Sequence, residues 1–186
     1  MDYIIKNGQI IDGLRHQPFH GDILISNGTI QEISSHLEIP ADFPAENILD
    51  ANGGYITPGF IDIHRHGDWQ ALHHGDDELL NRQGLTSIVN GNCGLSVAPA
   101  GEKYARQIYD FLGSVTGKLE QDPFPLMNSM NNYMHALSKA KRSVNTGMLA
   151  GNGTIRAAVK GYASGKLSDE EVHQVWKTLE EAMSAG

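Results

Sequence analysis

Two short apolar segments, separated by a helix-forming segment, constrain the fold of this chain most. The residues from Phe60 to His64 predict a buried strand, and those from Leu85 to Val89 predict a second one. Between them, Asp76 to Leu80 predicts a short helix, because acidic side chains favour a helix N-terminus. Strands that alternate with helices are typical of βα units and a parallel sheet.

The pattern continues to the last residue. Helices are predicted from Glu102 to about Leu112 and from Pro123 to Ala140, with a third strand from Asn145 to Leu149. A final helix begins after Ser168, whose side chain forms a capping box with Glu171. Its apolar residues follow at helical spacing and are Val172, Val175, Trp176, Leu179 and Met183. Residues 57–186 thus contain about three βα units, whereas a complete TIM barrel has eight and needs ~250 residues. We therefore predict that they form an incomplete TIM-like (β/α) barrel, in a chain that looks cut short.

The first 56 residues differ in pattern. Apolar runs flank Asn7-Gly8 and again Asn27-Gly28, and Asn-Gly tolerates the positive φ angles of a two-residue hairpin turn. The sequence therefore predicts two hairpins in a small β-sandwich-type domain over residues 1–56.

Charge and composition exclude several classes of protein. The net charge is -8 and no basic run occurs, which argues against a nucleic-acid partner. No apolar stretch reaches about 18 residues and no signal-peptide pattern opens the chain, so we expect no membrane partner. The single cysteine, Cys93, favours a reducing, cytoplasmic location.

Candidate metal ligands follow both apolar segments. His64 and His66 share one face of a strand because strand side chains alternate, and Cys93 comes just after the second strand between glycines. Imidazole nitrogen with thiolate sulfur favours zinc. Taken alone, each feature also fits a plainer alternative, namely exposed histidines at a strand end and a small buried cysteine. Their placement at two successive strand ends favours a metal site.

These segments resemble a known family. The residues from Pro58 to His66 (PGFIDIHRH) resemble the first-strand signature of the amidohydrolase superfamily. Those from Gln83 to Pro99 (QGLTSIVNGNCGLSVAP) look like the D-aminoacylase, or N-acyl-D-amino-acid deacylase, branch. In that branch a cysteine in Gly-Asn-Cys-Gly replaces the carboxylated lysine of hydantoinase-like relatives. The resemblance extends over the whole chain, because the N-terminal residues look like the β domain of these enzymes.

The resemblance implies a zinc-dependent hydrolase that cleaves N-acyl-D-amino acids by attack of metal-bound hydroxide on the amide carbonyl. It implies one or two zinc ions, with Cys93 at the principal position and His64 and His66 at a second, weaker one. Two further histidines and a catalytic aspartate are expected beyond Gly186. We therefore expect the 186-residue chain to be inactive by itself.

The resemblance also suggests groups around a small-molecule substrate. Asp68 follows the histidines and could border the pocket, although a role in loop packing is an alternative. Arg156 could meet a substrate carboxylate, or it could be a solvated arginine near a helix start. Arg65 stands where the family often has a small residue and should point away from the metal. Asn152 stands where a histidine is common, which leaves a polar role there in doubt.

Two alternative functions stay open. One is another amidohydrolase that acts on cyclic amides, similar to dihydroorotase or hydantoinase, and Cys93 argues against it. The other is a truncated, non-catalytic binding or assembly module. An unclosed barrel leaves an edge strand open, so we also expect a homo-oligomer that forms through this edge.

Overall fold

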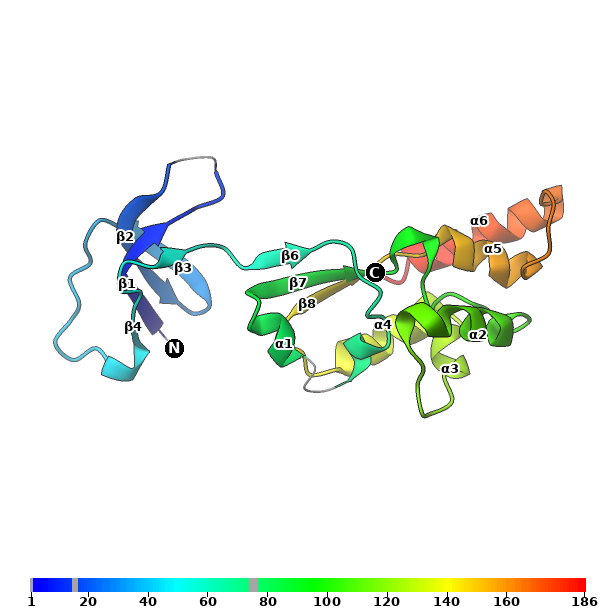
Figure 1. Ribbon diagram of the computed structural model, residues 1–186, viewed down its shortest axis with the longest axis horizontal. Helices are drawn as coiled ribbons and strands as arrows, with labels where there is room; N and C mark the ends of the chain where they lie inside the picture. The colour runs from blue at the N-terminus through cyan, green and yellow to red at the C-terminus, as the bar shows by residue number, and fades with distance from the viewer. Residues whose placement is uncertain (1, 15–16, 74–76) are drawn as a thin grey trace. The chain divides into compact units, whose positions relative to one another are not determined.

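The chain divides into two compact units, residues 1–58 and 59–186. The computed structural model describes residues 2–14, 17–73 and 77–186 (Figure 1). The division lies two residues after the boundary predicted from the sequence. Each unit has its own sheet, and each is described by itself below.

The first unit is built on one long central strand. Strand β1 (Asp2–Ile10) pairs antiparallel with β2 (Phe19–Ser26), which pairs antiparallel with β3 (Thr29–Ser34). On its other side β1 pairs parallel with β4 (Ile48–Asp50) and β5 (Tyr55–Ile56), and the short 3-10 helix η1 (Ala45–Asn47) precedes β4. These strands form one five-stranded sheet, so the predicted sandwich is not confirmed.

Of the two predicted hairpins, one is present. Asn27 and Gly28, with φ of 52° and 75°, join β2 to β3 as a two-residue turn. The hairpin predicted at Asn7-Gly8 is wrong, because β1 runs on through both residues. Asn7 has a φ of 58° but forms a bulge in β1, and its N–H donates to Asp22 Oδ1 at 2.9 Å.

The second unit contains a three-stranded parallel sheet in the order β6-β7-β8. Its strands are β6 (Phe60–Asp62), β7 (Leu85–Asn90) and β8 (Asn145–Met148). The parallel pairing of successive strands is as predicted, while the incomplete barrel stays a prediction. The prediction of a buried first strand is wrong: β6 is an edge strand that ends at Asp62, and Phe60 and Ile61, which point to opposite faces, are both more than half exposed.

Helices follow each strand. The α-helices are α1 (Asp77–Asn81), α2 (Ala105–Thr116), α3 (Phe124–Met127), α4 (Met130–Lys139), α5 (Asn152–Lys160) and α6 (Asp169–Met183), with 3-10 helices η2 (Gln70–Leu72) and η3 (Asn92–Gly94). The helix predicted over residues 123–140 is two helices, because the Ser129 side chain accepts the Asn132 N–H and starts α4. Asp76, the predicted start of α1, lies outside the described residues.

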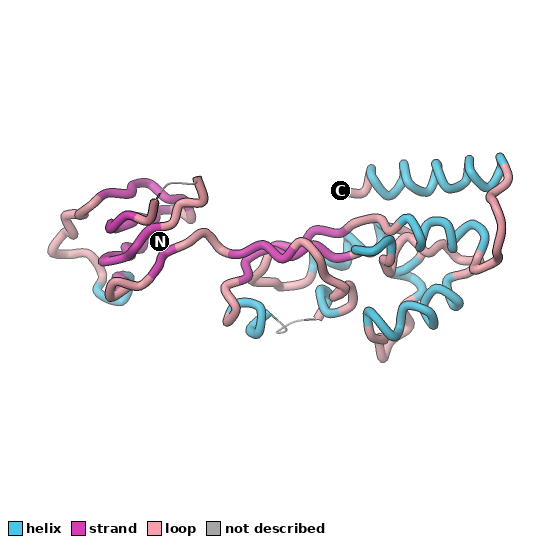
Figure 2. Tube along the Cα trace, turned by 45° about the horizontal axis from the view of Figure 1, so that its top comes forward, coloured by secondary structure: helices cyan, strands magenta, loops and turns pink. Residues whose placement is uncertain are grey.

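The core of this unit lies among α2, α3, α4 and the segment after β6. Trp69, Ile108 and Tyr133 are buried there together with Met127 and Met130. In Figure 2, α5 and α6 run side by side, and α6 begins with the predicted Ser168–Glu171 capping box. The final helix is present as predicted, and of its apolar residues Val172, Trp176 and Met183 are exposed. Among the described residues, no helix has the length and apolar character needed to cross a membrane.

Candidate metal centre

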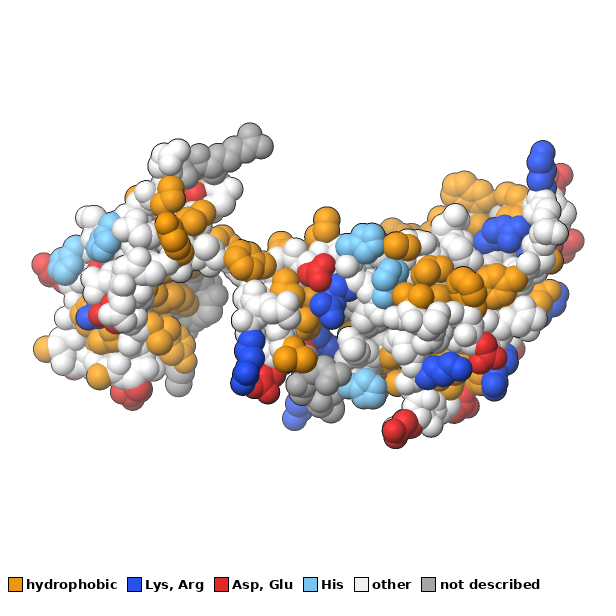
Figure 3. Space-filling view, in the orientation of Figure 1, with side chains coloured by type: hydrophobic (Ala, Val, Ile, Leu, Met, Phe, Trp, Pro, Cys, Tyr) orange, Lys and Arg blue, Asp and Glu red, His pale blue; other side chains and the backbone are white. Residues whose placement is uncertain are grey.

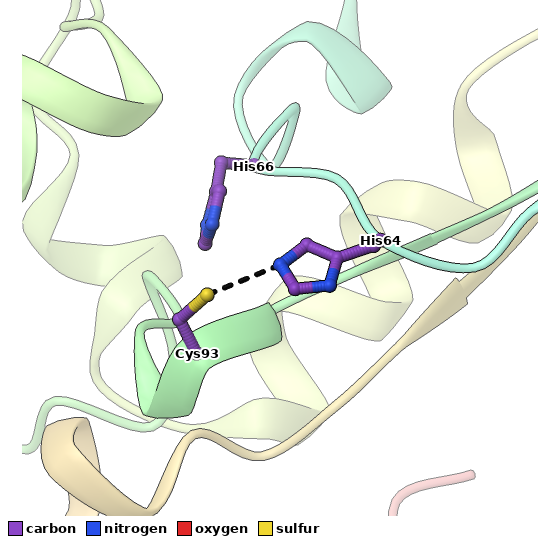
Figure 4. Close-up of side chains that lie close together, drawn as sticks. All are labelled: His64, His66 and Cys93. Atoms are coloured by element: carbon purple, nitrogen blue, oxygen red, sulfur yellow. Dashed lines mark hydrogen bonds between the residues drawn. The ribbon is translucent and has the colours of Figure 1, made fainter.

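The three candidate ligands lie at the carboxyl ends of two neighbouring strands. His64 and His66 lie in the loop that follows β6, beyond the strand in which they were predicted, and Cys93 lies in η3 directly after β7 (Figure 4). Because β6 and β7 are parallel neighbours, their carboxyl ends share one edge of the sheet. The topology therefore brings together residues that are 29 positions apart in the sequence.

The side chains converge on one another. One ligand atom from each of His64, His66 and Cys93 lies within 4.8 Å of the others. The Nε2 atom of His64 is 3.1 Å from the Sγ atom of Cys93, and the two imidazole ring centres are 5.9 Å apart. His64 and Cys93 are exposed and His66 is half-buried, so a metal ion could reach the cluster from solvent.

The local backbone explains how Cys93 faces the histidines. Cys93 has a φ of 57°, in the left-handed region, and the preceding Gly91 has a φ of 78°. A Cβ atom on Gly91 would lie 2.3 Å from the carbonyl oxygen of Leu149, so only glycine fits there. On the other strand, Asp62 Oδ1 accepts the main-chain N–H of His64 at 3.1 Å, which turns the chain out of β6.

The donor set fits a zinc ion. Zinc binds imidazole nitrogen at about 2.0–2.1 Å and thiolate sulfur at about 2.3 Å, so a nitrogen and a sulfur 3.1 Å apart can share one ion. His66 Nδ1 is buried and has no hydrogen-bond partner among the described residues, which is unusual for a polar atom inside a protein. A two-histidine, one-cysteine set leaves room for further ligands or water.

Asp68 is buried among neighbouring groups. Its side chain is fully buried, its Oδ2 accepts the Val97 N–H at 3.0 Å, and its carbonyl accepts the Tyr133 hydroxyl at 2.6 Å. Burial raises the pKa of the Asp68 carboxyl, and the Val97 hydrogen bond acts against that rise. These contacts fit the alternative of a packing role, while the substrate contact stays a prediction.

Arg156 also makes contacts of its own. It lies in the middle of α5, not at its start, and it donates to the carbonyl oxygen of Gly165 at 2.9 Å. Arg65 approaches Asp62 at 3.5 Å, and together with His66 it lines a cavity of about 330 Å³. Arg65 thus lines the same cavity as His66, and Arg156 is not part of the cluster of three.

Comparison with known proteins finds relatives over the whole chain. No family model matches. The chain is 32% identical to an N-acyl-D-aspartate deacylase of Alcaligenes xylosoxydans xylosoxydans, over 100% of this chain and 35% of that protein. The crystal structure of an N-acyl-D-glutamate deacylase from Bordetella bronchiseptica, complexed with zinc and a phosphonate mimic of the tetrahedral intermediate, matches with a TM-score of 0.78 at 28% identity.

That match covers 100% of this chain and 36% of the Bordetella protein. A D-aminoacylase structure concerned with a binuclear metal centre matches with a TM-score of 0.76 at 26% identity, over 99% of this chain and 36% of that one. The chain thus spans about a third of the length of the relatives that it matches.

Proposed function

We infer, from homology along its whole length to the N-acyl-D-amino-acid deacylases, that this chain is part of a zinc-dependent hydrolase of the D-aminoacylase type within the amidohydrolase superfamily. One observation of the structure carries the proposal. His64, His66 and Cys93, from two successive strand ends, bring their ligand atoms within 4.8 Å of one another.

We assign the three side chains as zinc ligands. The Cys93 thiolate is the softest of them and supplies negative charge, while His64 and His66 supply neutral imidazole nitrogens. Zinc bound here would activate water for attack on an amide carbonyl and polarise that carbonyl. The left-handed turn at Cys93 and the hydrogen bond from His64 N–H to Asp62 hold the ligands on one side of the sheet edge.

The substrate proposal comes from the relatives. By their names, they act on N-acyl-D-aspartate and N-acyl-D-glutamate, and a small N-acyl-D-amino acid is therefore the substrate class we propose for the whole protein. Arg65 and His66 line an open cavity of about 330 Å³ next to the ligands, which gives such a molecule access. These names favour a linear N-acyl substrate over the cyclic amides of the alternative function.

We propose that the 186-residue chain binds metal but does not turn over substrate by itself. It spans about a third of its relatives and brings three candidate ligands together in its described part, whereas hydrolysis also needs groups that bind substrate and move protons. The alternative of a non-catalytic module makes the same prediction for this chain. Activity of a longer form of the protein separates the two.

The experiment measures metal and activity together. Zinc content is determined by mass spectrometry for the purified wild type, Cys93→Ala and His66→Ala, with Arg156→Ala as a matched control outside the cluster. We expect the first two variants to lose zinc and the control to keep it. Release of free amino acid from N-acetyl-D-glutamate and its L enantiomer is measured for the chain and for any longer form. Unchanged zinc in Cys93→Ala would refute the ligand assignment.

We also propose that the isolated chain associates with itself through the edge strand β6. Phe60 and Ile61 in β6 are 56% and 63% exposed and Ile63 just after it is 70% exposed, and Figure 3 shows exposed hydrophobic side chains on this unit. An open strand edge with apolar neighbours favours pairing with another copy. Light scattering should find dimers or larger species that Ile61→Lys reduces. A single monomeric species for the wild type would contradict the proposal.

A further inference from the structure

Two asparagine side chains join the loop that carries His66 to the end of β7. The main-chain N–H of Gly67 donates to Oδ1 of Asn90 at 3.0 Å, and Nδ2 of Asn92 donates to the carbonyl oxygen of Arg65 at 3.3 Å. Arg65 precedes His66 and Gly67 follows it, so these two hydrogen bonds bracket the histidine on both sides.

The same network reaches the loop of Cys93. Nδ2 of Asn92 also donates to the carbonyl oxygen of Val89 at 2.8 Å, and that oxygen accepts the main-chain N–H of Arg65 at 3.1 Å. The carbonyl of Asn92 accepts the Leu95 N–H at 2.8 Å, which closes the turn around Cys93. One set of hydrogen bonds therefore fixes the residues on either side of His66 and the turn that presents Cys93.

The position of the His66 ring depends on this bracket. The loop that carries His66 has no regular secondary structure, and the buried Nδ1 atom of His66 has no hydrogen-bond partner in the described part of the chain. The ring is therefore held through its backbone and its edge contact with His64, and not through a hydrogen bond of Nδ1. Ligands held at a fixed separation bind a metal without the entropy loss of ordering them first.

The two asparagine side chains that make these hydrogen bonds are buried. Asn90 is fully buried and Asn92 is 9% exposed. Nδ2 of Asn90 has no partner among the described residues, a cost that an apolar side chain would avoid. The contact that Asn90 does make, through Oδ1 to Gly67, therefore accounts for an asparagine at this buried strand end.

We propose that Asn90 and Asn92 are positioning residues that hold His66 beside Cys93 and so set the affinity of the site for its metal. The inference rests on the proposed metal centre and adds the groups that fix its geometry. Neither asparagine is one of the three proposed ligands. Both act through the main chain on either side of His66 and through the turn at Cys93.

The test is a titration of the purified, metal-free protein with Co²⁺, which stands in for zinc and whose absorption spectrum reports thiolate coordination. We expect Asn90→Ala and Asn92→Ala to weaken Co²⁺ binding by about 10- to 100-fold, the range typical when groups that orient ligands are removed. The charge-transfer band of the Cys93 thiolate should also weaken at saturation. Circular dichroism confirms that each variant is folded, and Asn92→Ala decides the test if Asn90→Ala does not fold.

The control is Tyr109→Phe. Its hydroxyl is hydrogen-bonded to the main-chain N–H and carbonyl of Leu119 at 3.0 and 3.2 Å, so this variant loses two partly buried hydrogen bonds between α2 and Leu119. The ring that contacts Trp69 is kept, and no hydrogen bond of the ligand loops is removed. We expect its Co²⁺ affinity to stay within twofold of the wild type.

The outcomes separate the two proposals. If the wild type binds Co²⁺ and Asn92→Ala binds it equally well, the positioning role is overturned and the metal centre stands. The same conclusion follows if Tyr109→Phe loses as much Co²⁺ affinity as the asparagine variants do. If the wild type binds no Co²⁺, the proposed metal centre fails, and this inference fails with it.

Discussion

At the scale of single residues, Cys93 takes a backbone conformation that cysteine seldom adopts. A left-handed φ of 57° costs a residue with a Cβ atom about 1 kcal/mol or more, and such strain often marks a functional position. In this left-handed conformation, the Cys93 Sγ atom lies 3.1 Å from the Nε2 atom of His64. The strain also predicts an unusual order of stability among variants.

We expect Cys93→Gly to have a free energy of unfolding about 1 kcal/mol higher than that of Cys93→Ala in metal-free protein. Both variants lose the thiol and its contact with His64, so the difference reports the backbone strain minus the greater flexibility of glycine in the unfolded chain. Urea unfolding measures it. Ala158→Gly, in the middle of α5, should go the other way and lose about 1 kcal/mol. If Cys93→Gly were no more stable than Cys93→Ala, a strain of this size would be contradicted.

Asp22 supports the first unit through its charge. Burial by itself would raise the pKa of its carboxyl. The main-chain N–H groups of Leu37 and Asn7, each donating at 2.9 Å, and the nearby His36 and His20 all lower this pKa, and together they outweigh burial. The pKa in the folded state is therefore lowered from 3.8. Because the pKa is lowered on folding, the ionised Asp22 carboxylate stabilises the fold fully above pH 3.8. This contribution is lost as the pH falls through the pKa that Asp22 has in the folded protein.

We expect Asp22→Ala to lose about 1.5–3 kcal/mol of unfolding free energy at pH 7, the usual loss for a hydrogen-bonded charged group. The deficit should shrink as the pH falls below 3.8. Hydrogen exchange of peptides from residues 1–58, measured over a pH series, follows this unit separately. The control is Asp42→Asn at an exposed position. A deficit that is the same at pH 7 and at pH 3 would contradict the assignment to charge.

At the scale of elements, the same dipeptide gives two different structures. Asn7-Gly8 and Asn27-Gly28 both place asparagine at a positive φ, as the sequence predicts. Asn27-Gly28 forms a hairpin turn, whereas Asn7 forms a bulge because its N–H is taken by Asp22, fifteen residues away. Local sequence predicts the backbone angle, but a distant partner decides whether the chain reverses.

A similar limit applies to β6 and α6. Their apolar periodicity predicts a strand and a helix correctly, yet Ile61 and Trp176 are mostly exposed. Periodicity shows which side chains share a face, and it does not show what covers that face. The Ser168–Glu171 capping box, by contrast, involves residues only three positions apart, so it was predictable from the sequence.

The capping box gives the prediction at this scale. Ser168→Ala should lower the stability of α6 by about 1 kcal/mol, because the Glu171 N–H loses its hydroxyl acceptor. Hydrogen exchange should quicken in the first turn of α6. Ser184→Ala, beyond the other end of the helix, is the matched control and should stay within about 0.5 kcal/mol of the wild type. Equal effects of both substitutions would argue against the cap.

At the scale of the whole molecule, the candidate site was predictable to the extent that topology determines it. Parallel neighbouring strands place the residues after β6 and after β7 at one edge, so His66 and Cys93 were expected together. The surroundings were not predictable. Asp68 is buried by its contacts with Val97 and Tyr133, which are 29 and 65 positions away, and no local pattern predicts those contacts.

The two compact units give the last prediction, because the candidate metal ligands all lie in residues 59–186. A ligand that binds only folded protein stabilises it by RT ln(1 + [L]/Kd), about 2.7 kcal/mol at a concentration 100 times Kd. Zinc should therefore stabilise the second unit and leave the first unchanged. Both tryptophans, Trp69 and Trp176, belong to the second unit, and Trp69 is buried in its core, so tryptophan fluorescence follows that unit alone.

Fluorescence-detected melting should shift upward as zinc is added, by an amount that grows with the logarithm of its concentration. Hydrogen exchange of peptides from residues 2–14 and 17–58 should not change. Cys93→Ala should abolish most of the shift, because it removes the thiolate ligand and leaves both cores intact. A shift of the same size in Cys93→Ala would place the zinc elsewhere, and slower exchange in the first unit would show that the two units unfold as one.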